Sequence, residues 1–213
     1  MKIIILVPIY NDWQSASKLL EEINSNIVDL ECQFSVIIVN DASSEQQSIN
    51  VFNKENLRSI KIINMKENRG HARCIASGLK YIYEKEEFDY VIPMDGDGED
   101  RPEEIKNFIE YLRYSPDKPI VGERLKRSES LLFKFCYSVH KILTFSFTGQ
   151  SIKFGNYTCL PKATVKKMIN DSATWSSFSG ALTKVEKDRS TVPSIRGSRY
   201  FGPSKMSFKN LII

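Results

Sequence analysis

Histidine and cysteine are scarce in this sequence, which limits the metal and redox chemistry that it could support. Only two of its 213 residues are histidine and four are cysteine. The four cysteines lie far apart, without a CxxC pair and without a histidine at zinc-finger spacing (Cys32, Cys74, Cys136 and Cys159). A zinc finger or a disulfide framework would need a closer pattern, so we expect free thiols in a reducing compartment.

The sequence also lacks a long apolar run and a strong charge of one sign. No segment approaches the roughly 20 apolar residues of a membrane helix. The apolar start is interrupted at Pro8 without a small-residue cleavage site, which favours a buried strand over a signal peptide. The net charge is only +4, whereas nucleic-acid-binding proteins usually carry a larger and clustered excess. We therefore expect no nucleic-acid partner.

What the sequence does contain is a regular alternation of short apolar runs and amphipathic segments. We expect strands at residues 2–7, 34–39, 60–64, 90–94 and 119–122. We expect helices between them, the first with Asp12 as its N-cap and the later ones at residues 70–85 and 102–114. Continuous apolar strands separated by helices are typical of a parallel sheet that is covered on both faces. The fold class is therefore α/β, with a Rossmann-like, mostly parallel sheet in a single domain.

Ligands of such sheets bind at the carboxyl ends of the strands, and the densest polar group of this sequence follows the fourth predicted strand. Four carboxylates fall there within six residues (Asp95, Asp97, Glu99 and Asp100). In extended backbone an Asp-x-Asp pair directs both carboxylates to one side of the chain. Hard oxygen ligands of this kind suit Mg²⁺ or Mn²⁺, and Gly96 and Gly98 leave room for a diphosphate. The cluster predicts a divalent metal site.

Three other interpretations of the acidic cluster fit less well. An EF-hand loop that began at Asp95 would need glycine at position 100 and glutamate at position 106, where the sequence has Asp100 and Lys106. A phosphatase with a DxD nucleophile would, by resemblance to that family, carry the motif after its first strand. A solvated acidic loop, with Asp100 as the N-cap of the next helix and Glu103 and Glu104 in its first turn, accounts for these three residues but not for the Asp-x-Asp pair.

The character of the sequence changes beyond residue 123. Residues 123–129 form a charged loop, and residues 131–147 carry the apolar and aromatic pattern of a helix. We expect those aromatic side chains to lie mainly in the core, with some of them facing an exposed or membrane-proximal groove. Residues 195–205 are expected to form a glycine-rich basic loop. The chain stops at Ile213 in the middle of an apolar pattern, which we interpret as truncation before further hydrophobic sequence, such as membrane helices.

Six short motifs follow one another in an order that resembles a known family. The first four are Val7–Asn11 (VPIYN), Val39–Ser43 (VNDAS), Asn68–Ala72 (NRGHA) and Asp95–Asp100 (DGDGED). In this order they resemble the family 2 glycosyltransferases of the GT-A fold. The later GER at 122–124 and RYFGPSK at 199–205 resemble the polyprenyl-phosphate branch of that family, the dolichyl-phosphate mannose synthases and their bacterial relatives. The resemblance covers essentially the whole chain.

The resemblance implies a role for each motif. A nucleotide-sugar donor would be bound by Pro8, Tyr10, Asn11, Asp41, Asn68, Gly70, Arg73 and Asp95. Mg²⁺ or Mn²⁺ would be held against the donor diphosphate by Asp95, Asp97 and Glu99. The sequence departs from the family at two of these motifs, because relatives commonly have Asp-Asp where this chain has Asn40-Asp41, and often glutamine where it has Glu99.

A phosphate acceptor is already an anion, so it needs cations to hold it rather than a general base. The sequence is rich in cations after residue 123, and Lys134 and Ser138 would share one face of the expected helix because they lie four residues apart. The expected acceptor-binding residues are Arg124, Lys134, Ser138, Arg196, Ser204 and Lys205. Three residues are expected to be catalytic, namely Asp97, Arg124 and Arg199.

Together, the resemblance and the cations predict a metal-dependent, inverting transferase that moves a hexose from a UDP- or GDP-sugar to polyprenyl phosphate or another lipid-linked acceptor. Residues 1–123 would bind the donor and residues 124–213 the acceptor, in the cytoplasm at the inner face of the membrane. Two alternatives stay open. One is a polysaccharide transferase that uses a sugar hydroxyl, with Glu186 or Asp188 as the general base. The other is a nucleotide-binding module that has lost activity, an idea that only Asn40 supports.

Overall fold

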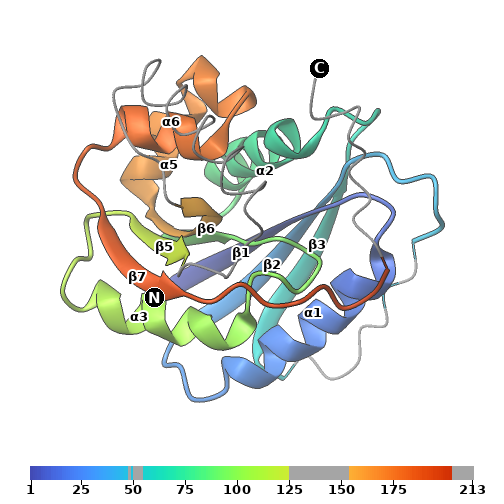
Figure 1. Cartoon of the computed structure of the whole chain (residues 1–213), viewed down its shortest axis with the longest axis horizontal. Helices are drawn as coiled ribbons and strands as arrows, with labels where there is room; N and C mark the ends of the chain where they lie inside the picture. The colour runs from blue at the N-terminus through green and yellow to red at the C-terminus, as the bar shows by residue number, and fades with distance from the viewer. Residues whose placement is uncertain (48, 50–54, 125–153, 203–213) are drawn as a thin grey trace, which may run out of the picture.

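The strands of the chain form one mixed sheet with helices on both sides (Figure 1). The computed structural model describes residues 1–47, 49, 55–124 and 154–202. Its seven strands lie in the order β3-β2-β1-β4-β6-β5-β7. Their bounds are Lys2–Ile9 (β1), Gln33–Asn40 (β2), Leu57–Asn64 (β3), Tyr90–Pro93 (β4), Ile120–Arg124 (β5), Phe154–Pro161 (β6) and Ser190–Ser194 (β7).

Most strand pairs are parallel, as the sequence predicts. The pairs β1–β2, β2–β3, β1–β4 and β5–β7 are parallel, whereas β6 runs antiparallel to both β4 and β5. The sequence pattern did not predict β6 or β7. Because β6 is reversed, its first residues lie at the edge of the sheet where the other strands end, so Asn156 joins the carboxyl-end edge.

The helices cover both faces of the sheet, which confirms the predicted layering. One face carries α1 (Trp13–Asn26) and α3 (Ile105–Leu112), and the other carries α2 (His71–Lys85), α5 (Lys162–Ile169) and α6 (Phe178–Val185) (Figure 1). Two short 3₁₀ turns complete the described elements, η1 (Pro102–Glu104) and η2 (Ser172–Trp175). None of the helices in the described part of the chain is long and apolar enough to cross a membrane.

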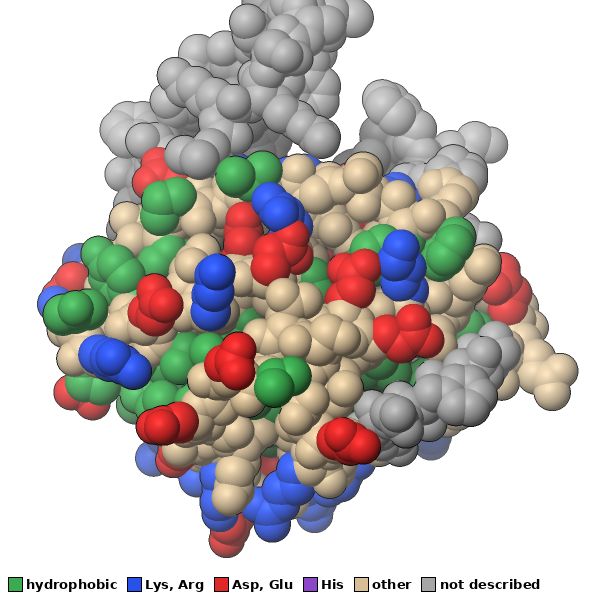
Figure 2. All heavy atoms as spheres, turned by 90° about the horizontal axis from the view of Figure 1, so that it is seen from below, with side chains coloured by type: hydrophobic (Ala, Val, Ile, Leu, Met, Phe, Trp, Pro, Cys, Tyr) green, Lys and Arg blue, Asp and Glu red, His purple; other side chains and the backbone are tan. Residues whose placement is uncertain are grey.

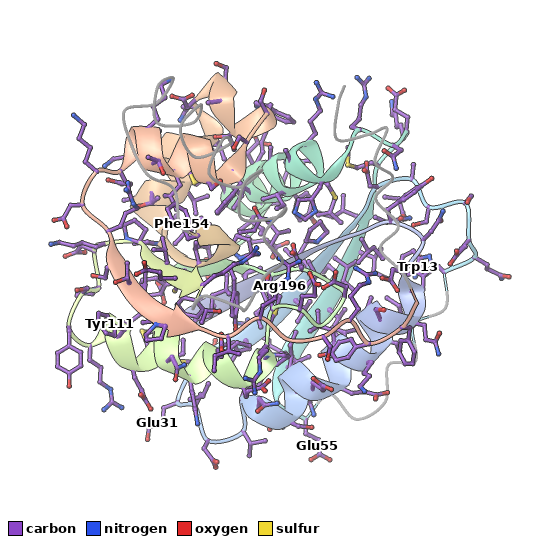
Figure 3. All side chains as sticks on the ribbon, viewed as in Figure 1. Trp13, Glu31, Glu55, Tyr111, Phe154 and Arg196 are labelled. Carbon is purple, nitrogen blue, oxygen red and sulfur yellow. The ribbon has the colours of Figure 1, made fainter. Side chains whose placement is uncertain are left out.

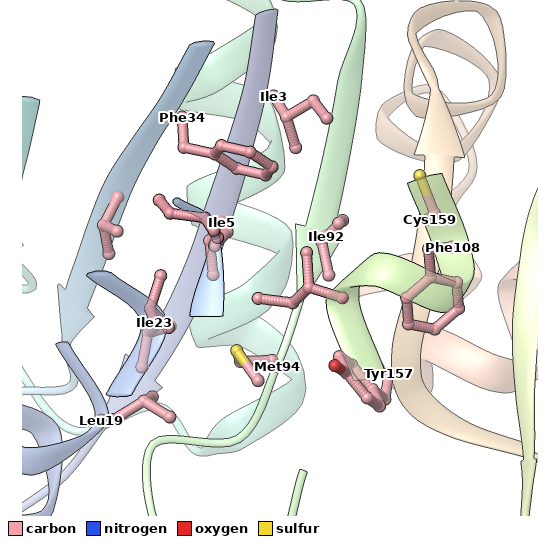
Figure 4. Close-up of a cluster of buried hydrophobic side chains, with 14 of the residues drawn as sticks. Ile3, Ile5, Leu19, Ile23, Phe34, Ile92, Met94, Phe108, Tyr157 and Cys159 are labelled. Carbon is pink, nitrogen blue, oxygen red and sulfur yellow. The ribbon is translucent and has the colours of Figure 1, made fainter. Parts of the chain in front are cut away.

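Alternate residues of β1 belong to the two different cores, because side chains of a strand point to opposite faces. Ile3 and Ile5 pack in the cluster with α1 and α3, which Figure 4 shows beside Leu19 and Ile23. Ile4 and Leu6 pack in the other cluster, with α2, α5 and α6. Burial of each large aliphatic side chain contributes about 1.5–3 kcal/mol, so β1 stabilises both layers at once.

Three expectations about helices change in the structure. The expected helix at residues 102–114 is split into η1 and α3, because Pro102 begins a 3₁₀ turn. Asp12 stands at the N-cap position of α1, but its side chain makes no capping hydrogen bond. Asp100 is not an N-cap either, since that position before η1 is held by Arg101. The expected helix at 131–147 lies outside the described residues.

Gly78 allows α2 to approach β1 closely, and a larger side chain there should destabilise the fold. A Cβ atom at this position would lie 2.4 Å from Leu6 Cδ1 and 3.0 Å from Val39 Cγ2, and both of these side chains are fully buried. We expect Gly78→Val to lower the free energy of unfolding by about 1–3 kcal/mol, the usual scale of overpacking, in urea denaturation. Ser77→Val, at a half-buried position on the same helix, is the control. An equal loss in both variants would contradict the packing argument.

Candidate active site

The predicted donor-binding and metal-binding motifs meet at one edge of the sheet. Because β1, β2, β3 and β4 are parallel, the polar segments that follow them all emerge at their carboxyl ends. Arg124 ends β5, and the segment after β7 leaves the sheet at the same edge. The side chains come from separate parts of the sequence, and the sheet brings them together.

Asn11 joins the end of β1 to the loop that follows β2. Its Oδ1 accepts hydrogen bonds from the backbone N–H groups of Ser44 (2.8 Å) and Glu45 (3.2 Å). Its own N–H donates to Ser43 Oγ at 2.8 Å, and its φ of 49° is a left-handed conformation that asparagine tolerates better than most residues. Tyr10 beside it is 39% exposed, and Pro8 is buried within β1. Tyr10 therefore remains accessible to a ligand.

Asp41 holds the loop that leads into α2. Its two carboxylate oxygens accept hydrogen bonds from the backbone N–H groups of Arg69 (2.8 Å) and Gly70 (2.9 Å), and only 4% of its surface is exposed. Gly70 has a φ of 85° as the N-cap residue of α2, a conformation that favours glycine. Asn68 and Arg73 of this segment are exposed. In this structure Asp41 shapes the loop, and its predicted contact with a nucleotide stays a prediction.

Asn40 has a structural role that a carboxylate could not fill in the same way. Its Nδ2 donates to Asn64 Oδ1 at 2.8 Å, which joins β2 to β3, and its Oδ1 accepts from the Ser43 N–H at 3.0 Å. An aspartate lacks the N–H donor for the first of these bonds. The departure from Asp-Asp is therefore explained by local bonding and gives no support to a loss of activity.

The acidic residues lie in a tight turn rather than in extended backbone. Gly98 has a φ of 88°, the Glu99 N–H donates to Asp97 Oδ1 at 3.0 Å, and the Asp95 N–H donates to Asp100 Oδ2 at 2.8 Å. We call residues 95–100 the acidic turn. The Asp100 carboxylate thus stabilises this turn from within and does not cap the following helix.

The acidic turn carries more negative charge than its neighbours compensate. Burial raises the pKa of the Asp97 carboxyl, and the like charge of Asp95 raises it further, against the opposing effect of nearby arginines. The pKa of Asp100 is raised well above its usual range, mainly by burial and then by Asp95. Such a surplus of negative charge attracts a cation.

Two arginines from the segment after β7 pair with the acidic turn. The Arg199 guanidinium contacts Asp97 Oδ2 and lies 2.8 Å from Asp12 Oδ2, and the Arg196 guanidinium contacts Glu99 Oε2. Figure 3 shows Arg196 on this segment, between β7 and the start of α1 at Trp13. The Asp12 carboxylate, expected to cap α1, instead pairs with a residue far along the chain.

Arg124 and two residues that the sequence analysis missed complete the edge. Arg124 is exposed, and its guanidinium lies over Gly155, where a Cβ atom would come within 2.7 Å of Nη2. Asn156 Nδ2 lies 2.6 Å from His71 Nε2 and 3.4 Å from Asp95 Oδ1. His71 stood inside a recognised motif, but Asn156 gave no signal because β6 was not predicted.

Glu186 and Asp188, the expected bases of the hydroxyl-acceptor alternative, lie at the opposite edge. Asp188 precedes β7 and is 2.6 Å from Lys118, which precedes the parallel strand β5. Glu186 accepts hydrogen bonds from Thr164 (3.0 Å) and Lys167 (2.9 Å) of α5, the helix that follows the carboxyl end of the reversed strand β6. Both carboxylates have local partners and lie away from the acidic turn.

Several predicted acceptor residues cannot be placed relative to this edge. They lie outside the described residues (Lys134, Ser138, Ser204 and Lys205). Of the expected acceptor-binding cations, Arg124 and Arg196 lie at the same edge as the acidic turn, and so does Arg199, which was expected to be catalytic.

On the face with α1 and α3, acidic and basic side chains are interspersed (Figure 2).

The chemical type of the ligand atoms in the acidic turn suits a divalent cation. Asp95, Asp97 and Glu99 offer hard carboxylate oxygens, and the pKa of Asp97 is raised first by burial and then by the charge of Asp95. In the arrangement seen, no three acidic, histidine or cysteine side chains among the described residues converge on one point to hold a metal. The arginine pairs occupy two of the three predicted ligands.

Removing the Asp41 carboxylate should destabilise the protein. Asp41→Ala leaves the N–H groups of residues 69 and 70 without their buried carboxylate acceptor, so we expect the free energy of unfolding to fall by about 1–3 kcal/mol. Urea denaturation measures this, with Asn68→Ala in the same loop as the control. Unchanged stability would show that the carboxylate does not hold the loop. Weaker nucleotide binding by Asp41→Ala could follow from the loosened loop alone, so it would not identify a direct contact.

The raised pKa of Asp100 predicts a stability difference that depends on pH. Burial raises the pKa of this carboxyl well above its usual range, so the charged form costs stability at high pH, and this cost shrinks as the pH falls from the raised pKa toward the usual one. In buffer with EDTA, we expect Asp100→Asn to melt above the wild type at neutral pH, and we expect the difference to shrink as the pH falls toward the ordinary carboxyl pKa of about 4. Thermal melting measures this. A constant difference would contradict the assignment.

Comparison with known proteins supports both the family and the fold. A family model described as glycosyl transferase family 2 matches residues 4–171. The undecaprenyl-phosphate 4-deoxy-4-formamido-L-arabinose transferase of Salmonella paratyphi B is 25% identical over 218 residues. That alignment covers 99% of this chain and 64% of the relative, so the chain spans about 64% of the relative's length.

Two solved structures share the arrangement of strands and helices. S. aureus TarS in complex with UDP-GlcNAc has a TM-score of 0.63 at 17% identity, with 95% of this chain and 60% of that chain covered. Glucosyl-3-phosphoglycerate synthase from Mycobacterium tuberculosis, in complex with Mn²⁺, UDP-glucose and phosphoglyceric acid, has a TM-score of 0.65 at 12% identity, with 95% and 73% covered. These similarities concern the fold, whereas the family model matches most of the sequence. The chain belongs to glycosyl transferase family 2 and has the GT-A fold.

Proposed function

We propose that the chain transfers a hexose, with inversion, from a UDP- or GDP-sugar to polyprenyl phosphate or another lipid-linked acceptor. The observation that carries this proposal is the meeting of the acidic turn with Arg124, Arg196 and Arg199 at one edge of the sheet. The name of the Salmonella relative, an undecaprenyl-phosphate transferase, supports the acceptor class. The activity would be exerted at the inner face of the cytoplasmic membrane, where such an acceptor is embedded.

The donor would lie across the loops after β1, β2 and β3. Pro8, Tyr10 and Asn11 would contact the base and ribose, together with the loop that Asp41 holds through Arg69 and Gly70. Asn68 and Arg73 are exposed in that loop, and Asp95 would contact the donor from the far side. The complexes of TarS with UDP-GlcNAc and of the mycobacterial synthase with UDP-glucose support a nucleotide-sugar donor.

The acidic turn would bind Mg²⁺ or Mn²⁺ through Asp95, Asp97 and Glu99. Such an ion, when bound, would neutralise the charge that develops on the leaving diphosphate. The Mn²⁺ in the mycobacterial structure supports a divalent ion, although that protein shares only 12% of its aligned residues with this chain. Asn156 and His71 would orient the Asp95 carboxylate, since both have nitrogen atoms 3.4 Å from its Oδ1.

The acceptor phosphate would attack the anomeric carbon of the sugar directly. One of its oxygens forms the new bond while the bond from that carbon to the diphosphate breaks, so a single displacement inverts the configuration. No proton has to be removed from a phosphate monoester oxygen that is already charged. Arg124, Arg196 and Arg199 would hold this anion, with Lys134, Ser138, Ser204 and Lys205 as further predicted contacts in the half formed by residues 124–213.

The alternative with a hydroxyl acceptor lacks support at this edge from its two expected bases. Glu186 pairs with α5 and Asp188 with Lys118, away from the acidic turn. Asn40, the only residue that favours an inactive module, joins β2 to β3 through Asn64.

Four variants separate the two kinds of acceptor. With a lipid phosphate as nucleophile, Arg124→Ala and Arg199→Ala should each reduce transfer by about 100-fold or more, because charge-assisted contacts to the reacting phosphate are lost. Glu186→Gln and Asp188→Asn should retain near wild-type activity. The measurement is transfer of radiolabelled sugar from a UDP- and GDP-sugar panel, with Mn²⁺, into lipid extracted by organic solvent.

The opposite pattern would overturn the proposal. Loss of a general base typically reduces the rate about 100- to 10,000-fold, so a hydroxyl acceptor would make one of the two carboxylates indispensable while the arginine variants remain active. The assay should use both this chain and any longer parent protein, with membranes added. Lys187→Ala, an exposed cation close to both carboxylates in sequence, is the matched control for surface charge.

A further inference from the structure

The segment after β7 lies across the acidic turn and is bonded to it through the backbone. We call residues 195–202 the strap, which runs as an extended chain from β7 to α1 (Figure 1). The Gly197 N–H donates to the Glu99 carbonyl at 2.8 Å, and the Tyr200 N–H donates to the Asp97 carbonyl at 2.9 Å. The strap is therefore paired with the same turn that would hold the metal.

The strap also occupies one carboxylate oxygen on each of two predicted metal ligands, Asp97 and Glu99. Asp97 Oδ2 contacts the Arg199 guanidinium, and Asp97 Oδ1 already accepts the Glu99 N–H at 3.0 Å. Glu99 Oε2 contacts the Arg196 guanidinium. While the arginines stay in place, fewer carboxylate oxygens are available to a divalent ion, so its affinity for the acidic turn is lower.

We propose that the strap arginines and the divalent metal occupy the acidic turn in alternation. In the donor-free protein, Arg196 and Arg199 neutralise Glu99 and Asp97. When the metal arrives with the donor diphosphate, it displaces both guanidinium groups, which then become available to the acceptor phosphate. The inference rests on the proposed function, and it deepens that function by stating how two arginines that pair with the acidic turn become available to the acceptor phosphate.

The hydrogen bonding of Arg199 leaves one of its donors unsatisfied, which makes it easier for this side chain to leave the acidic turn. Its two terminal nitrogens contact Asp97 and Asp12, but its buried Nε has no hydrogen-bond acceptor among the described residues. A buried donor without an acceptor costs stability. A divalent ion carries twice the charge of a guanidinium, so it competes well for a turn with surplus negative charge.

Contacts to buried or charged groups hold both ends of the strap. Buried Glu104 accepts hydrogen bonds from Ser194 Oγ (2.7 Å) and the Ile195 N–H (2.8 Å), which anchors the start. Further along, the Tyr200 ring packs on Gly98, where a Cβ atom would come within 2.5 Å of it. The Tyr200 hydroxyl donates to Glu22 of α1. The alternation therefore requires movement of residues 196–199, which lie between these two anchors.

Titration with Mn²⁺ in the absence of nucleotide tests this alternation on the whole chain. The electron paramagnetic resonance signal of free Mn²⁺ gives the affinity of wild type, Arg196→Ala, Arg199→Ala and Asp97→Ala. We expect each arginine variant to bind Mn²⁺ up to about fivefold more tightly than wild type, in line with the loss of one competing ion pair, and Asp97→Ala to lose binding. Arg101→Ala, which removes a charge paired with the neighbouring Glu103, is the control for general electrostatics.

Hydrogen exchange gives a second readout that does not depend on activity. The amides of Gly197 and Tyr200 are bonded to the acidic turn, so a peptide that spans residues 195–202 of wild type should exchange faster when Mn²⁺ is added with UDP or GDP. In Arg199→Ala the exchange should already be fast without the metal. Slower exchange on metal binding would overturn the alternation, because it would show that the strap closes further instead of opening.

The outcomes separate this inference from the proposed function. If wild type binds Mn²⁺ and both arginine variants bind it no more tightly than Arg101→Ala, the alternation is wrong and the metal site stands. If no variant binds Mn²⁺, or if Asp97→Ala binds it as wild type does, the metal assignment is wrong and the alternation fails with it. Tighter Mn²⁺ binding with reduced transfer in Arg199→Ala is the result that supports both.

Discussion

The parallel pairing of β1 with β2 on one side and β4 on the other determines where every other part of the site lies. It places the ends of these strands side by side, so that Asn11, Asp41 and Asp95 emerge at one edge although they are far apart in the sequence. The same strand supplies alternate side chains to both cores. A shift of one residue in its register would exchange the two cores and separate the polar loops as well.

Charge is the second constraint, and it works against the first. The sheet gathers carboxylates at this edge, and burial makes their charges costly, as the raised pKa values of Asp97 and Asp100 indicate. Part of this negative charge is compensated by Arg196 and Arg199, which come from the segment after β7 and are distant in the sequence. Catalytic groups commonly carry such unfavourable electrostatics, because the same charges that destabilise the free protein bind the ligand.

The elements with strong periodicity could be predicted from the sequence, and those that depend on long-range partners could not. β1, β2 and α2 carry uninterrupted apolar patterns and were predicted to within a few residues. β7 was missed because it buries few apolar side chains and contains Pro193, which an edge strand tolerates. Asp12 and Asp100 fit local capping patterns, but neither caps a helix. Asp12 pairs with Arg199 instead, and Asp100 accepts a hydrogen bond from the Asp95 N–H. Asn156 could not be recognised until the reversed strand was known.

The reversal of β6 has a consequence for how this fold can diversify. The chain leaves the sheet after Arg124 and returns at Phe154, and Glu123 is directly paired with Phe154 in the antiparallel register. Exit and return are therefore adjacent, both at the edge that carries the acidic turn. Any segment that joins Arg124 to Phe154, whatever its length, therefore has to begin and end at the edge that carries the acidic turn.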